Sequence, residues 1–342
     1  MSRRLSNQQQ RRIAAHQERQ LKTAIDETSL SDEQSGLVIA HYGRQLDVEV
    51  LHGEQTGQIV RCFMRANIAP LVTGDTVAFT TQNNGKVDGT QVRPKGIVSA
   101  GGARRNLLTR PDDRGVQRPI AANIDEILVV VAPKPDPHPF FIDRYLVAAD
   151  MCGIQPVIIC NKIDLLNDDN REQINALLNI YRHIGYTVLC LSSRQGEGLP
   201  AVQKHLCGKT CVVVGQSGVG KSSLIKALLP GVEIATGELS QATDKGKHTT
   251  TTARLYQLPA YEQQAGGILI DSPGIREFSL PHVPAQELLS HFIDLREHAA
   301  GCKFRDCRHD REPHCALLAA EEKGLVLVER MASYRHILAS LV

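Results

Sequence analysis

The architecture of this chain is set by eight consecutive residues, Gly215-Gln216-Ser217-Gly218-Val219-Gly220-Lys221-Ser222. They fit the pattern GxxxxGK(S/T), in which glycines let backbone N–H groups curl round phosphates and a helix N-terminus adds a favourable dipole. The apolar run Thr210–Val214 precedes them as a strand, and Ser223–Leu228 follows them as a helix. The stretch predicts a nucleoside triphosphate site, with Lys221 on the terminal phosphates and Ser222 on Mg²⁺.

Strands and helices alternate upstream of this loop, from about Ala122. Because the strands are apolar throughout, the pattern indicates a parallel sheet with helices on both faces. Ligands of such sheets bind beyond the carboxyl ends of the strands. The expected strands are Ile127–Ala132, Pro156–Cys160 and Thr187–Leu191, and the expected helices are Phe141–Cys152, Asn170–Ile184 and Leu199–Leu206.

Two further motifs stand at strand ends and point to the base. Asn161-Lys162-Ile163-Asp164 follows the strand Pro156–Cys160. A carboxylate at Asp164 can accept hydrogen bonds from guanine N1–H and N2–H₂, whereas adenine offers an acceptor at N1. We therefore expect GTP rather than ATP. Ser192-Ser193-Arg194, after the next strand, loosely matches the loop that backs the guanine in GTPases.

The motif Asp271-Ser272-Pro273-Gly274 follows the apolar run Gly267–Ile270 and looks like the DxxG switch. Asp271 would hold Mg²⁺ through water, and the Gly274 N–H would sense the terminal phosphate. The polar segment 246–252 lies between the two phosphate motifs, and we favour its Thr250 for completing the Mg²⁺ shell as an order–disorder switch.

The glutamine that positions water in Ras-like enzymes is missing, because Gly274 is followed by Ile275-Arg276-Glu277. Hydrolysis should therefore be slow without a partner or another side chain. We assign catalytic roles to Lys221 and His248, although a surface-loop histidine is the alternative for His248. The residues expected to bind GTP are Asn161, Lys162, Asp164, Ser192, Ser193, Gly215, Gln216, Ser217, Gly218, Val219, Gly220, Lys221, Ser222, Ser223, Asp271 and Gly274, and those expected to bind Mg²⁺ are Ser222, Thr250 and Asp271.

The order of these motifs is unusual, because the guanine motif precedes the phosphate loop and the DxxG motif comes last. The sheet can still form, since moving the chain break leaves the strand neighbours unchanged. The nucleotide domain is therefore expected to be circularly permuted. Its second switch runs straight into the C-terminal domain, which suggests that nucleotide state is passed on mechanically.

Before this domain, five short β-rich runs fit a small barrel of the OB type, although other small barrels would show the same pattern. They are Gly36–Tyr42, Gln45–Leu51, Gln58–Phe63, Asp75–Thr81 and Gln91–Ile97. A basic, Gln-rich arm over residues 1–35 precedes them, and a solvated tail is the alternative interpretation. Basic residues at the barrel's edge could contact RNA phosphates or simply be solvated: Lys95, Arg104, Arg105 and Arg110.

After the nucleotide domain, Cys302, Cys307, His309 and Cys315 give the spacing C-x4-C-x-H-x5-C. Three thiolates and one imidazole are a closed tetrahedral set for one structural Zn²⁺. His314 is a competing fourth ligand, and free cysteines are the alternative. We expect helices over Pro284–Ala299 and Leu325–Leu341 to pack on this cluster.

The composition adds limits. A chain of 342 residues should form two or three domains, and a net charge of +2 is too mild to indicate nucleic-acid binding by itself. Nothing resembles a signal peptide or a membrane span, so we expect a cytoplasmic protein without membrane contact. The nine cysteines do not suggest a disulfide framework.

Taken together, the motif order, the barrel and the Cys₃His cluster resemble the circularly permuted GTPases of the RsgA (YjeQ) family, across essentially the whole chain. The segment GKHTTT is close to that family's usual GRHTTT. The resemblance implies an α/β fold of four parts: a basic arm (1–35), an OB-fold barrel (36–113), a permuted GTPase domain (114–281) and a helical zinc domain (282–342).

The resemblance also implies a GTPase that is stimulated by the small ribosomal subunit and acts late in its maturation. The barrel and the zinc domain would grip ribosomal RNA. The partners would be GTP or GDP and the subunit, with the protein itself a monomer. The alternative is a non-enzymatic RNA-binding module that uses GTP only as a conformational ligand.

Overall fold

The computed structural model describes residues 33–65, 68–82, 95–111, 116–231, 253–271, 283–304 and 307–341. These residues divide between two compact units. The first takes its described residues from 33–124, 253–257 and 268–271, and the second takes them from 125–231, 258–267 and 283–341.

The first unit is built on a five-stranded barrel. Its strands are β1 (Glu33–Tyr42), β2 (Gln45–Val50), β3 (Ile59–Met64), β4 (Thr76–Gln82) and β5 (Lys95–Gly101). They pair in the order β1-β2-β3-β5-β4, and β4 pairs back onto β1 to close the barrel. All pairs are antiparallel except β3 with β5. The expected OB-type barrel is therefore confirmed.

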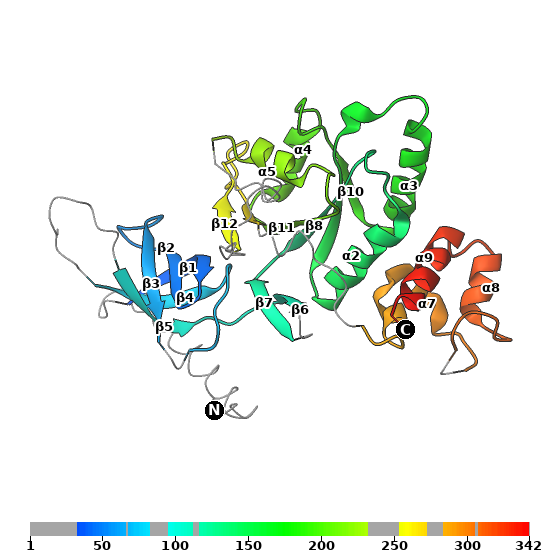
Figure 1. Ribbon diagram of the computed structural model, residues 1–342, viewed down its shortest axis with the longest axis horizontal. Coiled ribbons are helices and arrows are strands. Elements are labelled where there is room, and N and C mark those ends of the chain that lie inside the picture. The colour runs from blue at the N-terminus through cyan, green and yellow to red at the C-terminus, as the bar shows by residue number, and fades with distance from the viewer. Residues whose placement is uncertain are drawn as a thin grey trace, which may run out of the picture. The chain divides into compact units, whose positions relative to one another are not determined.

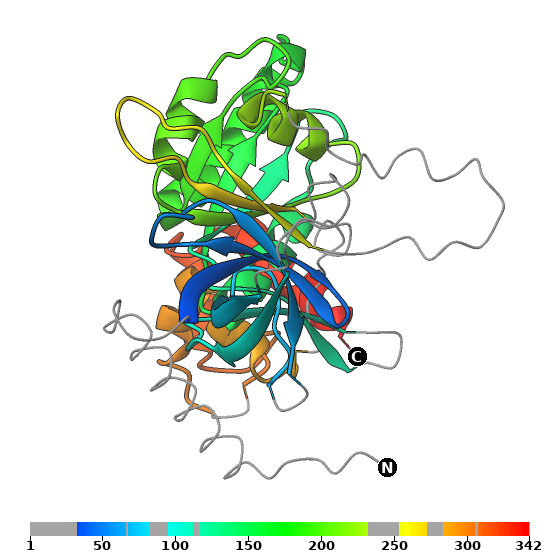
Figure 2. The same ribbon diagram turned by 90° about the vertical axis from the view of Figure 1, so that its left-hand side faces the viewer.

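The core of the barrel is formed by side chains that alternate along each strand between the inside and the outside. In β5, for example, buried and less buried residues alternate, so that one face points inward. The resulting apolar core contains Val38, Leu46, Val48, Val50, Val60, Cys62, Leu71, Val77, Phe79 and Val98. Figure 2 shows the strands curling round it. The fifth strand continues to Gly101, beyond the expected end at Ile97, and residues 91–94 lie outside the described part of the chain.

Two antiparallel pairs in the first unit were not expected from the sequence. The strand β6 (Leu107–Pro111) pairs with β7 (Gln117–Ala122), and β12 (Arg254–Gln257) pairs with β13 (Ile268–Asp271). β12 also adds to the barrel through a bridge between Ala40 and Arg254. The strand β13 was expected from the apolar run Gly267–Ile270, whereas β6, β7 and β12 are short and carry polar or proline residues, so their sequences lack a clear alternating pattern.

The second unit contains the expected parallel sheet. Its strands β8 (Glu126–Val131), β9 (Gln155–Cys160), β10 (Thr187–Cys190) and β11 (Thr210–Val214) lie in the order β10-β9-β8-β11. Every residue of β8 is buried, as a strand covered on both faces requires. The covering helices are α2 (Pro139–Met151), α3 (Arg171–Ile184), α4 (Leu199–Leu206) and α5 (Lys221–Leu228). In Figure 1, α2 and α3 lie on one side of the strands and α4 and α5 on the other.

The C-terminal part of the second unit is helical: η3 (Leu288–His291), α7 (Ile293–Ala299), α8 (Ala316–Glu322) and α9 (Val328–Ala339). The prediction of a single helix over Pro284–Ala299 is wrong, because this segment contains two separate elements, η3 and α7. Phe292 is extended, with φ −96° and ψ 97°, and separates the 3₁₀ turn from α7. Its fully buried ring packs edge-on against Tyr334, with ring centroids 5.6 Å apart. The free energy gained by burying this ring exceeds that of continuing the helix through Phe292.

A buried ion cluster ties α9 to α2. Arg330 of α9 is 2% exposed and donates to Asp143 of α2 and to Asp294 of α7, the latter at 2.7 and 2.9 Å. Because two carboxylates surround one guanidinium in a buried place, removing the arginine would leave uncompensated charge. The cluster therefore fixes how the C-terminal helices pack on the parallel sheet.

Candidate nucleotide and metal sites

The loop after β11 has the backbone that its glycines predict. Gly215, Gly218 and Gly220 have φ values of 139°, 82° and 92°, a region that side chains disfavour. A Cβ on Gly215 would lie 2.3 Å from the Val130 carbonyl oxygen, and one on Gly220 would lie 2.4 Å from the Asn161 Nδ2. The sequence needs glycine at both positions because the loop packs closely on its neighbours.

Lys221 closes this loop on itself. Its Nζ donates to the carbonyl oxygens of Gly215 and Gln216, both at 2.6 Å, and the residue is 8% exposed. It begins α5, whose N-cap is Gly220, a residue with no side chain to cap the first N–H groups. A buried cation and a helix N-terminus therefore face the same loop, an arrangement suited to phosphate. Ser222 is half-buried, whereas Ser223 is exposed.

Asn161 connects the phosphate loop to both guanine-side loops. It follows β9 and is fully buried. Its Nδ2 donates to the carbonyl oxygens of Val219 and Gly220 at 3.1 and 3.3 Å. Its Oδ1 accepts from the backbone N–H of Ser193 at 3.1 Å and from the hydroxyl at 2.7 Å. One amide side chain thus holds three segments that are far apart in the sequence.

Lys162 reinforces the same junction. It has φ 60°, in the left-handed region, and its Nζ donates to the carbonyl oxygens of Gly218 and Lys134, the latter at 3.2 Å. Its aliphatic stem therefore lies over the phosphate loop. Lys134 is a contact that the sequence did not indicate, because a carbonyl acceptor leaves no residue-type signal.

Asp164 is the middle residue of the 3₁₀ turn η1 (Ile163–Leu165) and is half-buried. The Ser192 hydroxyl donates to its Oδ1, and the same hydroxyl accepts the Gln195 N–H at 3.1 Å. A carboxylate that is fixed in this way keeps a second oxygen with which it can accept hydrogen bonds from a base. The structure thus brings both guanine-side motifs together at the carboxyl ends of β9 and β10.

The remaining residues predicted to bind the nucleotide are only partly described. Asp271 ends β13, is 7% exposed and lies opposite Arg254 in the β12–β13 pair. His248, Thr250 and Gly274 lie outside the described residues, so their assigned roles stay predictions. Gln216 is half-buried and Ser217 is exposed in the loop.

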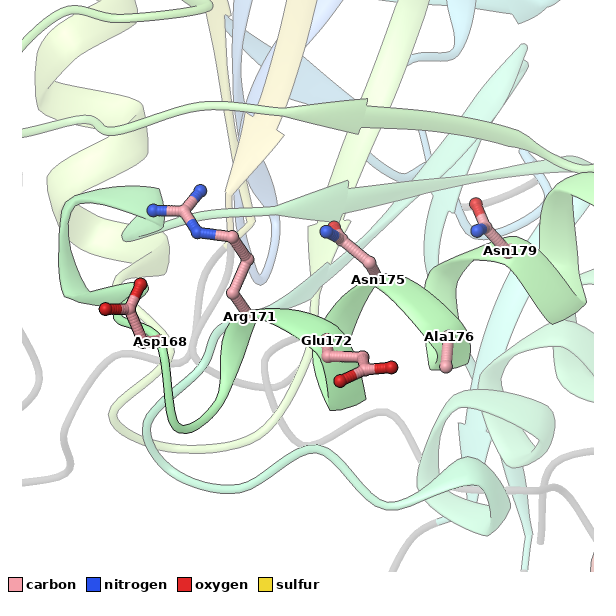
Figure 3. A pocket seen from close by; sticks show the side chains of 6 residues that line it. All are labelled: Asp168, Arg171, Glu172, Asn175, Ala176 and Asn179. Atoms are coloured by element: carbon pink, nitrogen blue, oxygen red, sulfur yellow. The ribbon is translucent and has the colours of Figure 1, made fainter.

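A separate polar pocket lies along α3 and contains none of the predicted site residues. It is lined by Asp168, Arg171, Glu172, Asn175, Ala176 and Asn179. Figure 3 shows Arg171, Asn175 and Asn179 projecting from the same side of the helix. This spacing of four residues is that of an ordinary polar helix face.

The four expected metal ligands converge. The ligand atoms of Cys302, Cys307, His309 and Cys315 all lie within 4.8 Å of one another. The Cys302 and Cys315 sulfurs are 3.8 Å apart, and His309 Nδ1 lies 3.5 and 3.4 Å from them. Tetrahedral Zn²⁺, with bonds of about 2.3 Å to sulfur and 2.0 Å to nitrogen, requires edges of about 3.8 and 3.5 Å. The three separations among Cys302, His309 and Cys315 match these edges, and with Cys307 the four donors could hold a metal ion.

His309 is the histidine of this cluster. It is 6% exposed, and burial lowers the pKa of its imidazole, which favours the neutral form that can bind a metal. His314, the competitor, is exposed and is not among the converging residues. Both histidines have positive φ, of 58° and 61°, so the loop turns sharply at each.

Glu312 organises the loop between the ligands, a role that sequence reasoning missed. Its carboxylate accepts the backbone N–H groups of Arg308, Asp310 and Arg311 at 2.9 to 3.1 Å. These hydrogen bonds lower the pKa of Glu312 to about 2. An acid between two ligands, at a spacing that lets it reach back over a turn, could have suggested this contact.

Two expectations from the composition concern the cysteines and membrane contact. All nine cysteines lie in the described part and all are free thiols. Among the described helices, none is long and apolar enough to cross a membrane.

Comparisons with known proteins agree with this geometry. The model of the RsgA GTPase family matches residues 102–281. A small ribosomal subunit biogenesis GTPase RsgA from Ectopseudomonas mendocina is 50% identical over 328 residues, which cover 96% of this chain and 92% of the relative. A protein of the same description from Pseudomonas aeruginosa (strain UCBPP-PA14) is 49% identical, with 99% and 95% covered.

Solved structures are similar over most of the chain. The crystal structure of YjeQ from Thermotoga maritima has a TM-score of 0.70 and 29% identity, covering 90% of this chain and 98% of that one. The crystal structure of YloQ, described as a circularly permuted GTPase, has a TM-score of 0.68 at 29% identity, with 90% and 95% covered. The circular permutation expected from the motif order is thereby confirmed.

Proposed function

This chain belongs to the RsgA GTPase family, and on that premise we propose that it hydrolyses GTP to GDP and phosphate in the maturation of the small ribosomal subunit. Relatives named for small ribosomal subunit biogenesis share about half of its residues over nearly its whole length, at 50% and 49% identity. We further propose that the subunit stimulates hydrolysis and that the protein acts late in maturation.

The observation that supports this function best is the set of hydrogen bonds made by Asn161. Its amide joins the phosphate loop to the Ser193 loop, and Asp164 is fixed by Ser192 beside it. A base-reading carboxylate and a phosphate loop are thus held in one connected arrangement, although the chain supplies them in reversed order. A nucleotide with a guanine base and several phosphates would place its base at the Asp164 carboxylate and its phosphates at the phosphate loop.

In this proposal the roles of Lys221 and Asp164 are supported by their surroundings, whereas those of Thr250 and His248 are predictions from the sequence. Lys221 neutralises charge that develops on the terminal phosphates, and Asp164 selects guanine. Mg²⁺, held by Ser222, Asp271 and Thr250, would neutralise phosphate charge when bound. His248 would orient the attacking water in place of the missing glutamine.

The Cys₃His cluster would hold one structural Zn²⁺. Four protein donors leave no open position for a substrate, so the metal would shape the C-terminal helices rather than take part in hydrolysis. With the barrel, these helices would contact ribosomal RNA. The proposal also includes a monomer in the cytoplasm, where ribosomal subunits mature.

Nucleotide affinity tests the first part of the proposal. Calorimetry with GDP, a non-hydrolysable GTP analogue and the matching ATP analogue should show binding of the guanine nucleotides only. Lys221→Ala should weaken the GTP analogue more than GDP, because the lysine is assigned to the terminal phosphates, whereas Lys226→Ala, on the exposed face of the same helix, should change neither. Equal affinity for the adenine analogue would refute the assignment of Asp164.

A further inference from the structure

Two cysteines stand where the guanine-side loops begin. Cys160 is the last residue of β9 and Cys190 the last residue of β10. They are directly opposite each other in the register of these parallel strands, so their side chains leave the same face of the sheet. Cys160 directly precedes Asn161, and Cys190 lies two residues before Ser192.

The two thiols differ in access and in chemical character. Cys160 is 1% exposed, whereas Cys190 is half-buried on β10, the strand at the end of the parallel order. The two thiols are close enough to influence each other's pKa, and the Arg182 guanidinium donates to the Cys190 sulfur at 3.5 Å. One thiol is therefore reachable and lies beside a cation, and the other is held behind it.

These contacts favour the thiolate form of Cys190, which is the form that reacts with oxidants. The hydrogen bond from Cys160 lowers the pKa of Cys190, and Arg182 lowers it further, against the opposing effect of burial. The same hydrogen bond, together with burial, raises the pKa of Cys160. Together with its greater exposure, this difference suits Cys190 to attack an oxidant as the thiolate and Cys160 to resolve the product as the thiol.

We propose that Cys160 and Cys190 form a reversible oxidation site, at which a peroxide-class oxidant closes a disulfide that weakens guanine nucleotide binding. In the first step the Cys190 thiolate attacks hydrogen peroxide, forming a sulfenic acid and releasing hydroxide. In the second step the Cys160 sulfur displaces the sulfenic oxygen, which leaves as water with the thiol proton. Two electrons pass from the thiols to the peroxide, and a dithiol reverses the change.

Closure should disturb the loops because the strands must approach each other. Cβ atoms of opposite residues on neighbouring strands lie at about the strand spacing of ~4.8 Å, whereas a disulfide holds them at about 3.8 Å. The loops start at this point: the Leu191 N–H donates to the Cys160 carbonyl at 2.8 Å, and the Ile163 N–H donates to the Leu191 carbonyl at 3.3 Å. A shift here moves Ser192 relative to Asp164, which would loosen the grip on the base.

The inference rests on the proposed guanine site, so its test separates the two. Full-length zinc-loaded protein is treated with hydrogen peroxide and then with dithiothreitol, and the affinity for a fluorescent GDP is measured at each stage. Peptide mapping by mass spectrometry identifies the linked cysteines. Released zinc is measured in parallel, so that oxidation of the Cys₃His cluster is recognised.

The expected result is a Cys160–Cys190 linked peptide and a loss of GDP affinity of about fivefold, which dithiothreitol restores. Cys190→Ser and Cys160→Ser should bind GDP normally when reduced and lose the response to peroxide. Cys207→Ser is the matched control, because Cys207 is half-buried like Cys190 but donates to the Gln203 carbonyl. This control should respond like the wild type.

Peroxide treatment that yields no Cys160–Cys190 peptide, with zinc retained, would overturn the proposal. So would a disulfide that leaves the GDP affinity unchanged, or a response that persists in Cys190→Ser. Failure of the reduced wild-type protein to bind GDP would instead refute the guanine site, whatever the mapping shows.

Discussion

The nucleotide loops and the Cys₃His cluster are both polar centres, but they are held together in different ways. In the nucleotide loops the side chains of Asn161, Lys162 and Lys221 donate to backbone carbonyl oxygens, so the loops fix each other. In the cluster, four ligand atoms point at one another, and Glu312 holds the backbone between them. The first centre is organised by the sheet, whereas the second is arranged so that it could hold a metal ion.

Metal removal should produce the largest effect. Structural Zn²⁺ contributes on the order of 10 kcal/mol to small metal domains, so chelation should unfold the region round the cluster. Hydrogen exchange should show lost protection over α8 and α9, while the strands β8 to β11 stay protected. His309→Ala should reproduce the loss, and His314→Ala should not. Unchanged protection of α8 after complete zinc removal would show that the metal is not structural.

Arg330→Met should be the next most damaging change, because it leaves the buried Asp143 and the half-buried Asp294 without their partner. We expect a loss of about 3 to 5 kcal/mol in the free energy of unfolding, measured by denaturant titration. Arg335→Met removes a more exposed ion pair with Glu321 and should cost less than about 1 kcal/mol. Similar losses for the two variants would mean that the Arg330 cluster does not join α9 to α2.

Lys221→Ala should lower GTP turnover by about 10² to 10³-fold, since removal of one group that stabilises developing charge costs about 3 to 4 kcal/mol. The fold should survive, because the loop keeps its contacts with Asn161 and Lys162. Phosphate release and thermal melting of the same sample measure both properties. Turnover close to that of the Lys226→Ala control would remove Lys221 from the mechanism.

Asp164→Asn should reduce the preference for GTP over ATP by about 10 to 100-fold, because an amide presents a donor as well as an acceptor to the base. Competition binding with the two nucleotides measures this ratio. Asp168→Asn, in the separate pocket on α3, is the matched control and should keep the full preference. A variant at Asp164 that still prefers GTP fully would show that another group reads the guanine.

The smallest expected effect is that of Glu126→Gln, at the start of β8, on the pH dependence of stability. Burial opposes its charged form, but hydrogen bonds from His205 and Lys209, at 2.9 and 2.7 Å, outweigh this and lower the pKa of Glu126. Because the pKa of Glu126 is lower in the folded state, its charged form stabilises the fold fully at pH values above 4.5, the ordinary pKa of this carboxyl. This stabilisation is lost as the pH falls through the lowered pKa. The Tm of Glu126→Gln should therefore depend less on pH below 5 than that of the wild type. Parallel curves would contradict this assignment.

Local patterns predicted most of the architecture. The glycines of the loop 215–220 and the apolar strands specified the parallel sheet, because these features act within a few residues. Phe292 and β12 could not be anticipated in the same way, since their conformations depend on distant partners such as Tyr334 and Ala40. The bridging role of Asn161 likewise depends on backbone carbonyl acceptors, which no residue type reveals.

Phosphate release, measured with GTP or ATP and with or without purified small ribosomal subunits, tests the central claim most directly. We expect slow GTP turnover by the protein alone, a rise on the order of tenfold or more with subunits, and no ATP turnover. Absence of GTP turnover under both conditions would contradict the account and favour a module that uses GTP only as a conformational ligand.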